Sequence, residues 1–218
     1  MLSHLDRIIF PDRCEVIEVI PLQRYVYPIF KNGRSSLYIT AEKNNWRIRL
    51  NDQIKKINSI DIILRDPQER LISGINTFIQ QTLRDNPGLD KNTVQWFAQN
   101  YLYLNRHYSS QFVWLVNLAR YLDLNAKLNF LSMSDINTIT PINEQPIGTP
   151  ADDTLIVAIS QIKNNEMYER IDTIIVNCIG QSMTFSNLLQ HIKITDSAAH
   201  EYVIEYAQQI LNPTYALS

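Results

Sequence analysis

The sequence predicts an α/β fold, with a central, mostly parallel sheet flanked by helices and a mainly helical C-terminal part. Three observations support this. Short runs of β-branched and aromatic residues alternate with segments of helical periodicity over the first two thirds of the chain. Two of these runs lead directly into helix-start signals. The last part of the chain shows helical periodicity alone, so we expect helices to cover both faces of the sheet.

The expected strands are short apolar runs bounded by turn-forming or polar residues. The clearest is Ile60–Leu64, which is apolar except at Asp61. The run that ends at Phe30 is interpreted as a buried strand although it contains Pro28. The expected strands are Glu15–Ile20, Arg24–Phe30, Trp46–Leu50, Ile60–Leu64 and Lys127–Met133.

The expected helices have recognisable ends. One begins where the loop Lys31–Ser36 leaves the second strand. Another has Asp66 as N-cap and Pro67 in its first position, and it stops at Asn86-Pro87-Gly88. The remaining segments of helical periodicity, the last with Asp196 as N-cap, are Val94–Leu104, Gln111–Leu122, Thr154–Lys163, Met167–Cys178, Phe185–Ile192 and Ser197–Leu211.

A proline-rich stretch, Pro141–Pro150, marks the predicted boundary within the chain. We expect residues 1–140 to form the α/β core and residues 141–218 to form a mainly helical part packed on it. The length of 218 residues fits one domain overall.

Composition excludes several classes of protein. The net charge of −2 argues against a broadly basic surface for nucleic acid or membranes. No apolar stretch is long enough for a transmembrane helix, and the charged N-terminus does not resemble a signal peptide. Cys14 and Cys178 are too few for a disulfide framework. We therefore expect a soluble, cytoplasmic protein with no nucleic-acid or membrane partner.

The chain has only five glycines, and they lie far apart. Both common glycine-rich nucleotide fingerprints, G-x-G-x-x-G and G-x-x-x-x-G-K-[ST], need two glycines close together. Any phosphate site in this protein must therefore be built around a single glycine.

The loop Lys31–Ser36 has the composition of such a site. A loop between a strand and a helix directs backbone N–H groups to one point, where the helix dipole adds positive charge. Lys31 and Arg34 supply cations, Ser35 and Ser36 supply hydroxyls, and Gly33 supplies conformational freedom. The alternative is a basic surface turn with an ordinary serine cap.

A second candidate segment, Arg65–Ser73, follows the clearest strand. Arg65 would emerge at the carboxyl edge of the sheet, where its fork can bind a phosphate, and Ser73 would add a hydroxyl. In the alternative interpretation Arg65 pairs with Asp66 or Glu69, Arg70 is solvated, and Ser73 is a small packing residue.

Taken in order, these segments resemble the sulfotransferase family. Tyr27–Leu37 resembles its 5′-phosphosulfate loop, and Ile63–Gly74 is similar to its 3′-phosphate motif, R-D-P-x-x-R-x-x-S. A weaker match, His107–Gln111 with the strand-like run that follows, is similar to a segment of carbohydrate sulfotransferases.

The resemblance implies a P-loop NTPase-like fold and the co-substrate 3′-phosphoadenosine 5′-phosphosulfate (PAPS), with 3′-phosphoadenosine 5′-phosphate (PAP) as product and no metal. Lys31 would stabilise the leaving phosphate, and Arg65 and Ser73 would hold the 3′ phosphate. The 5′ phosphate would be bound by Lys31, Asn32, Gly33, Arg34, Ser35 and Ser36. The acceptor would be a hydroxyl of a glycan or small molecule. Two features depart from the family: Arg34 stands where Ser or Thr is usual, and the segment between the motifs is short.

The general base is expected to be His107, because the pKa of histidine lies near neutrality and the residue falls in the third match. Glu42 and Asp52 are reserves. Tyr101, Tyr103, Tyr108 and Trp114 fit either an acceptor cleft or the core. Two other functions stay open, a non-catalytic nucleotide-binding protein of this fold and a P-loop-like kinase.

Overall fold

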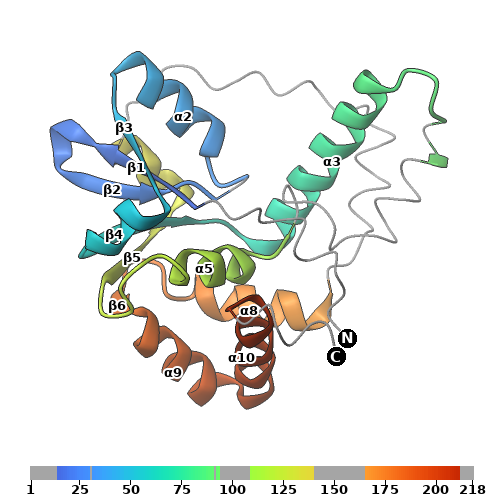
Figure 1. Ribbon diagram of the computed structural model, residues 1–218. Helices are drawn as coiled ribbons and strands as arrows, with labels where there is room; N and C mark the ends of the chain where they lie inside the picture. Colours follow the sequence, from blue (N-terminus) through green and yellow to red (C-terminus); the bar gives the residue numbers. More distant parts are fainter. Residues whose placement is uncertain (1–13, 30, 91, 94–108, 140–164, 212–218) are drawn as a thin grey trace.

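The computed structural model describes residues 14–29, 31–90, 92–93, 109–139 and 165–211. In this part of the chain six strands form one sheet in the order β3-β1-β2-β4-β5-β6 (Figure 1). Their bounds are Glu15–Val19 (β1), Arg24–Tyr27 (β2), Arg47–Leu50 (β3), Ser59–Leu64 (β4), Lys127–Ser132 (β5) and Ser182–Thr184 (β6). Every strand expected from the sequence is present. β2 is shorter than expected and ends before Pro28, which has no N–H to donate to a neighbouring strand.

The sheet is mixed. β2, β4 and β5 pair in parallel, whereas β1 is antiparallel to β2 and to β3, and β6 is antiparallel to β5. A turn as short as Ile20–Leu22 (η1) can join β1 to β2 only as antiparallel neighbours. The predicted parallel centre is confirmed, but the predicted predominance of parallel pairing is not.

The described helices agree with the expected ones to within a few residues, except for the short α6, which the sequence analysis did not predict. They are Arg34–Lys43 (α2), Pro67–Asp85 (α3), Gln111–Ala119 (α5), Ile136–Ile139 (α6), Glu166–Val176 (α8), Phe185–Thr195 (α9) and Ser197–Leu211 (α10), with 3-10 turns at Asn51–Lys56 (η2) and Met133–Asp135 (η3). The expected helices Val94–Leu104 and Thr154–Lys163 and the boundary at Pro141–Pro150 lie outside the described residues. The C-terminal part also contributes β6 to the sheet, which the sequence analysis did not predict.

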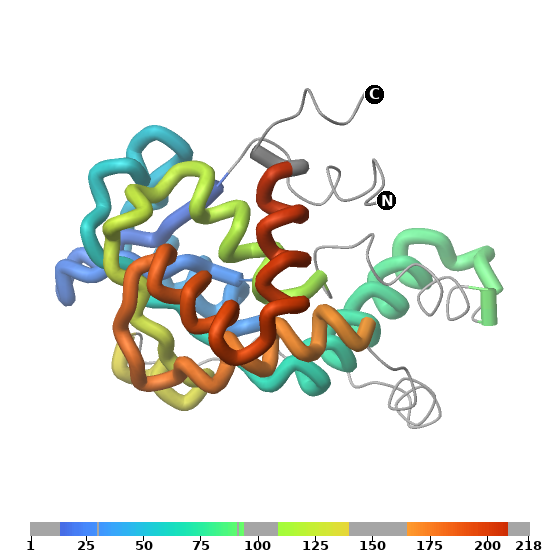
Figure 2. Tube along the Cα trace, turned by 90° about the horizontal axis from the view of Figure 1, so that it is seen from below, coloured from blue at the N-terminus to red at the C-terminus, as the bar shows by residue number. Residues whose placement is uncertain are grey.

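Helices cover both faces of the sheet, as expected. Alternate side chains of the strands enter two apolar clusters, because successive residues of a strand point to opposite faces. α2 and α6 close the smaller cluster, and α5, α8, α9 and α10 close the larger one (Figures 1 and 2). Cys14 and Cys178 are buried free thiols. None of the described helices is both long and apolar enough to cross a membrane.

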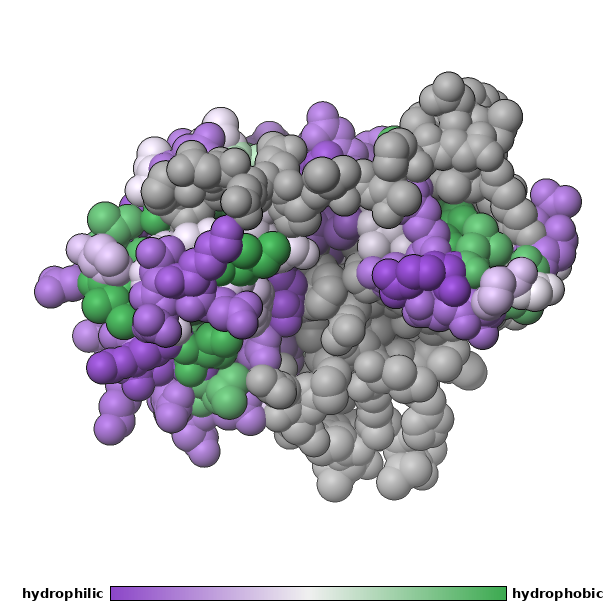
Figure 3. Space-filling model, turned by 90° about the horizontal axis from the view of Figure 1, so that it is seen from above, coloured by the Kyte–Doolittle hydropathy of each residue, from purple (hydrophilic) through white to green (hydrophobic). Residues whose placement is uncertain are grey.

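Helix α3 begins at the sheet and extends away from it in both views (Figures 1 and 2). Its buried stripe, Leu71, Ile75 and Ile79, repeats every fourth residue. A second stripe, Ser73, Thr77 and Gln81, lies two residues further along, which is about 200° around the helix. This stripe is polar and lines a cavity. Hydrophilic side chains cover most of the described part of the face seen from above, with small apolar groups between them (Figure 3).

Candidate anion-binding site

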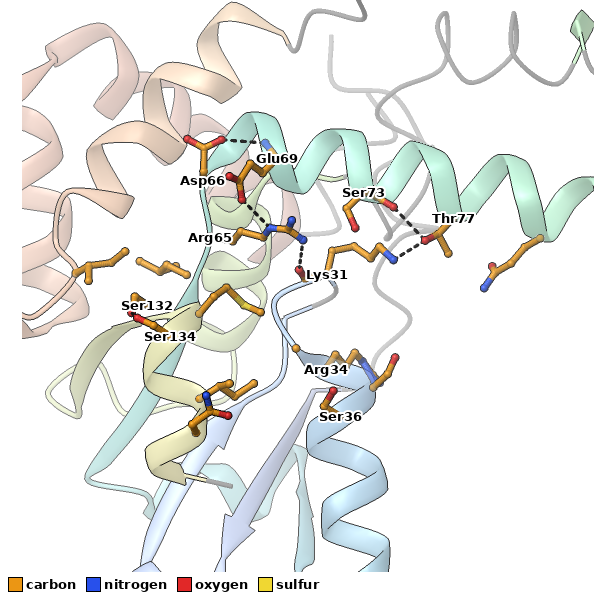
Figure 4. Close-up of a pocket in the computed structure, with 18 residues that line it drawn as sticks. Lys31, Arg34, Ser36, Arg65, Asp66, Glu69, Ser73, Thr77, Ser132 and Ser134 are labelled. Carbon is orange, nitrogen blue, oxygen red and sulfur yellow. Dashed lines mark hydrogen bonds and ion pairs between the residues drawn. The ribbon is translucent and has the colours of Figure 1, made fainter. Parts of the chain in front are cut away.

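A cavity of about 980 Å³ lies at the carboxyl ends of the parallel strands β2, β4 and β5 (Figure 4). Open α/β sheets bind ligands at this edge. The two segments singled out in the sequence both line it, one after β2 and one after β4. Seven of the eight expected ligand residues face the cavity: Lys31, Gly33, Arg34, Ser35, Ser36, Arg65 and Ser73.

The first segment forms its wall with an unusual backbone. Lys31 and Gly33 both have positive φ, 65° and 80°. Gly33 is the N-cap of α2 and has no side chain to cap the helix, and the first helical bond runs from Leu37 N to Gly33 O at 3.0 Å. The backbone N–H groups of the first turn therefore have no intrahelical partner and can serve an anion. The positive φ of Gly33 strains any residue that has a Cβ, and an added Cβ would also push aside the end of the Ile136 side chain.

The side chain of Lys31 reaches across the cavity to α3, where Nζ donates a hydrogen bond to Thr77 Oγ1 (Figure 4). Thr77 Oγ1 in turn donates to Ser73 O at 3.0 Å. Burial lowers the pKa of Lys31, and the charges of Arg65 and Arg70 lower it further. The ammonium thus sits in a positive field that a bound anion would offset.

The second segment forms its wall with Arg65, directly after β4, and with side chains of the regular helix α3. Asp66 accepts a bond from Glu69 N at 2.9 Å and caps α3, as predicted. Arg65 pairs with Glu69, 3.3 Å from Nε to Oε2, and its Nη1 donates to Lys31 O at 3.4 Å. The pairing expected in the alternative interpretation is therefore present, yet Arg65 still lines the cavity.

The polar stripe of α3 extends beyond the motif. Ser73, Thr77 and Gln81 recur every fourth residue and all line the cavity. The sequence analysis singled out Ser73 alone. Helical periodicity, applied outward from Ser73, would have found the other two.

Arg70 is not solvated, so that part of the alternative interpretation is wrong. The residue is 2% exposed, and Nη1 donates to Ser109 O. Burial lowers the pKa of Arg70 to about 10, although the charge of Asp172 opposes this shift. Arg70 therefore bonds the backbone just before α5, and it does not line the cavity itself.

Asn32, the eighth expected ligand residue, is fully buried and does not line the cavity. Its Nδ2 donates to Ile63 O at 2.8 Å and to Gln111 Oε1 at 2.7 Å. Gln111 also accepts from Arg65 N at 3.0 Å and donates from Nε2 to Arg65 O at 2.9 Å. These buried amides hold the loop from inside.

A buried carboxylate fixes the beginning of α5. Asp172 of α8 accepts bonds from Ser110 Oγ at 2.6 Å, Gln111 N at 2.8 Å and Phe112 N at 3.0 Å. Burial raises the pKa of Asp172, while these bonds and the charge of Arg70 act against the shift. The C-terminal part, through Asp172, thereby fixes the start of α5, where Gln111 bonds both segments that line the cavity. No sequence signal identified Asp172.

Arg34 stands where the sulfotransferase motif usually has Ser or Thr, and its side chain is paired with other residues of the protein. Its Nη2 lies 2.9 Å from Glu15 Oε2, and its guanidinium stacks over Tyr38 at 4.2 Å from the ring centre. Tyr38 also donates to the same carboxylate. The charge of Arg34 is thus largely balanced, and its backbone N–H remains at the helix start.

The segment after β5 forms a third wall, which the sequence analysis missed. Ser132, Ser134 and Asn137 line the cavity there, beside Met133 and Ile136. Ser132 Oγ donates to Asp135 at 2.6 Å, which sets the turn. The strand-end rule, applied to the expected strand Lys127–Met133, would have found this wall.

The expected general base cannot be placed, because His107 lies outside the described residues, as do Tyr101, Tyr103 and Tyr108. Neither reserve lines the cavity: Glu42 is exposed near the far end of α2, and Asp52 pairs with Lys55 at 3.0 Å. Trp114 packs in the larger apolar cluster, so its core alternative holds.

Among the described residues no group of three or more His, Cys, Asp or Glu side chains could hold a metal ion. The chain matches no protein-family model, no curated protein and no solved structure. The site is therefore interpreted from its own geometry.

Proposed function

We propose that the protein is a PAPS-dependent sulfotransferase that transfers a sulfuryl group to the hydroxyl of a glycan or small molecule. One observation carries the proposal. The two segments that resemble the family's phosphate motifs, far apart in sequence, line a single cavity after adjacent parallel strands. Its volume, about 980 Å³, is at the upper end of the range for ligand sites and leaves space for an acceptor beside a nucleotide.

In this proposal the start of α2 binds the 5′ phosphosulfate through the N–H groups and hydroxyls of Ser35 and Ser36. Arg65 and Ser73 bind the 3′ phosphate. The acceptor oxygen attacks sulfur in line, a new S–O bond forms, and the bond from sulfur to the bridging phosphate oxygen breaks. Lys31 stabilises the charge that develops on the departing phosphate. The acceptor's proton passes to a general base, for which His107 stays the expected residue.

Binding rearranges two contacts. Lys31 Nζ exchanges Thr77 for a phosphate oxygen, and the Arg65 fork exchanges Glu69 for another. The first exchange replaces a neutral hydroxyl acceptor by a charged one, and the second replaces an ion pair with an exposed carboxylate by one with a phosphate. No metal ion enters the proposed mechanism, because Lys31 and the first turn of α2 supply the positive field.

Calorimetric titration with PAP tests the proposal. We expect the wild type to bind, and Lys31→Ala and Arg65→Ala each to lose about 10- to 100-fold in affinity, which is the effect of one charge-assisted bond. Arg84→Ala is the matched control, because Arg84 carries the same charge on α3 and is exposed near its end. Absence of binding by the wild type, or equal affinities in all variants, would overturn the proposal.

Transfer of labelled sulfate from PAPS to a panel of hydroxyl acceptors separates an enzyme from a non-catalytic nucleotide-binding protein. An enzyme forms labelled product, and Lys31→Ala abolishes its formation. The non-catalytic alternative gives PAP binding with no product. Magnesium-dependent ATP turnover would indicate a kinase instead.

A further inference from the structure

Gln111 occupies an unusual place in the site. It is fully buried, 0% exposed, at the first position of α5, and it lies behind the cavity wall. Both ends of its side-chain amide pair with the backbone of Arg65, Oε1 with N–H at 3.0 Å and Nε2 with C=O at 2.9 Å. The amide thus gives Arg65 the two bonds that a neighbouring strand would give.

The same Oε1 accepts a third bond, 2.7 Å from Asn32 Nδ2. Asn32 follows Lys31 in the first segment, and its Nδ2 also bonds Ile63 O of β4 at 2.8 Å. One side chain therefore joins the two anion-binding segments. A glutamate would lack the donor for Arg65 O, and an apolar residue would leave buried polar groups without these bonds.

The link is rigid at its base. Asp172 accepts bonds from Gln111 N and from its neighbours Ser110 and Phe112. The bond from Arg65 Nη1 to Lys31 O is 3.4 Å long and so contributes less, whereas Asn32 Nδ2 also bonds Ile63 O of β4 directly at 2.8 Å. The start of α5 therefore helps to fix the relative position of Lys31 and Arg65, in addition to the pairing of β2 with β4.

We infer that Gln111 is a positioning residue that sets the separation of the two anion-binding segments, so that the site favours a ligand with two anionic groups over a ligand with one. The inference rests on the proposed function, in which each segment binds one phosphate. A ligand with one phosphate engages one segment and is indifferent to their separation. A ligand with two needs both in register at once, so a changed separation weakens one of its contacts, and each 1.4 kcal/mol lost lowers the affinity about tenfold.

The experiment compares three ligands by calorimetry: PAP, adenosine 5′-phosphate and adenosine 3′-phosphate. The proteins are the wild type, Gln111→Ala and Gln111→Met, the last of which keeps most of the side-chain volume without its hydrogen bonds. The matched control is Asn117→Ala, because Asn117 is buried on the same helix and bonds Tyr27 Oη of β2 at 3.5 Å, which lies outside residues 31–36 and 65–73.

We expect the Gln111 variants to lose about tenfold or more in affinity for PAP and less than about threefold for each monophosphate. Asn117→Ala should leave all three affinities within about twofold, because its effect is confined to stability. An equal loss for all three ligands would overturn the inference alone, since it would reduce Gln111 to a support of the fold. No binding of any ligand by the wild type would overturn the proposed function, and the inference with it.

Discussion

The two candidate anion-binding segments, residues 31–36 and 65–73, reach one cavity by different means. Residues 31–36 use the backbone, with positive φ at Lys31 and Gly33 and the N–H groups of the first turn of α2. Residues 65–73 use side chains, Arg65 directly after β4 and Ser73 on the regular, well-capped helix α3. Backbone groups are present whatever the side chains are, so the first segment depends on conformation as well as on the Lys31 side chain, whereas the second depends on side chains alone.

The two helices differ in the same way. α2 buries only Leu37 and Ala41, whereas α3 buries Leu71, Ile75 and Ile79 along one stripe. A fully buried leucine contributes about 1.5–3 kcal/mol. The first segment therefore relies on a strained turn at the start of a lightly packed helix, and the second on a firmly packed one. Changes to the backbone should damage the first far more than the second.

The largest effect is expected from Gly33→Val. A β-branched residue at φ 80° costs about 1–3 kcal/mol, and its Cβ displaces Ile136, so the first turn of α2 moves. Affinity for PAP, measured by calorimetry, should fall by more than about 100-fold, because the 5′-phosphate donors no longer converge.

Gly180→Val is the control for Gly33→Val. Gly180 has φ +84° with no atom within 4 Å of an added Cβ, and it lies outside both segments. It should lower the midpoint of thermal unfolding through backbone strain and leave PAP affinity nearly unchanged. Equal losses of PAP affinity in the two variants would show that the backbone of the first segment has no special role.

The sequence predicted the second segment more fully than the first. Asp66, Pro67 and the apolar stripe are local signals, and they fixed the cap, the start and the buried face of α3. In the first segment local signals predicted the turn and the helix start, but not that Asn32 points inward. That orientation depends on Gln111, far away in the chain, so no local pattern contains it.

Long-range partners explain the other differences. Arg70 looks like an exposed residue of a helix, but it is buried because Ser109 and Asp172 lie beside it. β6 is three residues long, too short for a periodic signal, and exists because β5 offers it an edge. The predicted predominance of parallel pairing was wrong because the short turn η1 makes β1 and β2 antiparallel, and β3 and β6 also join the sheet in antiparallel pairs.

A change of pH is expected to have an intermediate effect on PAP affinity. This effect tests the ammonium group of Lys31, the cation of the first segment. In the free protein the pKa of Lys31 lies below its ordinary value of 10.5, mainly because the side chain is buried. A bound phosphate raises it again, so between the two pKa values binding takes up one proton and PAP affinity falls about tenfold per pH unit as pH rises. The phosphate itself is fully ionised there, because its second pKa is about 6.

Calorimetry in buffers of different ionisation enthalpy measures this proton uptake. Arg65→Ala should weaken binding and also move the fall in affinity to higher pH, because the charge of Arg65 helps to lower the pKa of Lys31. An affinity that stays constant up to pH 10.5 would show that the ammonium of Lys31 does not contact the ligand.

The smallest effect is expected from Ser73→Ala, and it tests the side chains of the second segment one group at a time. Loss of one hydroxyl donor should weaken PAP binding about three- to tenfold, the value of a single hydrogen bond. Binding of adenosine 5′-phosphate should not change, because that ligand has no 3′ phosphate.

Thr77→Val, one turn further along the same stripe, removes the acceptor that holds Lys31 Nζ in the free protein. Because Lys31 leaves Thr77 when phosphate binds, this variant should change PAP affinity less than Ser73→Ala does. If Ser73→Ala weakened both nucleotides equally, the two segments would not divide the phosphates between them, and the contrast between a backbone site and a side-chain site would have to be abandoned.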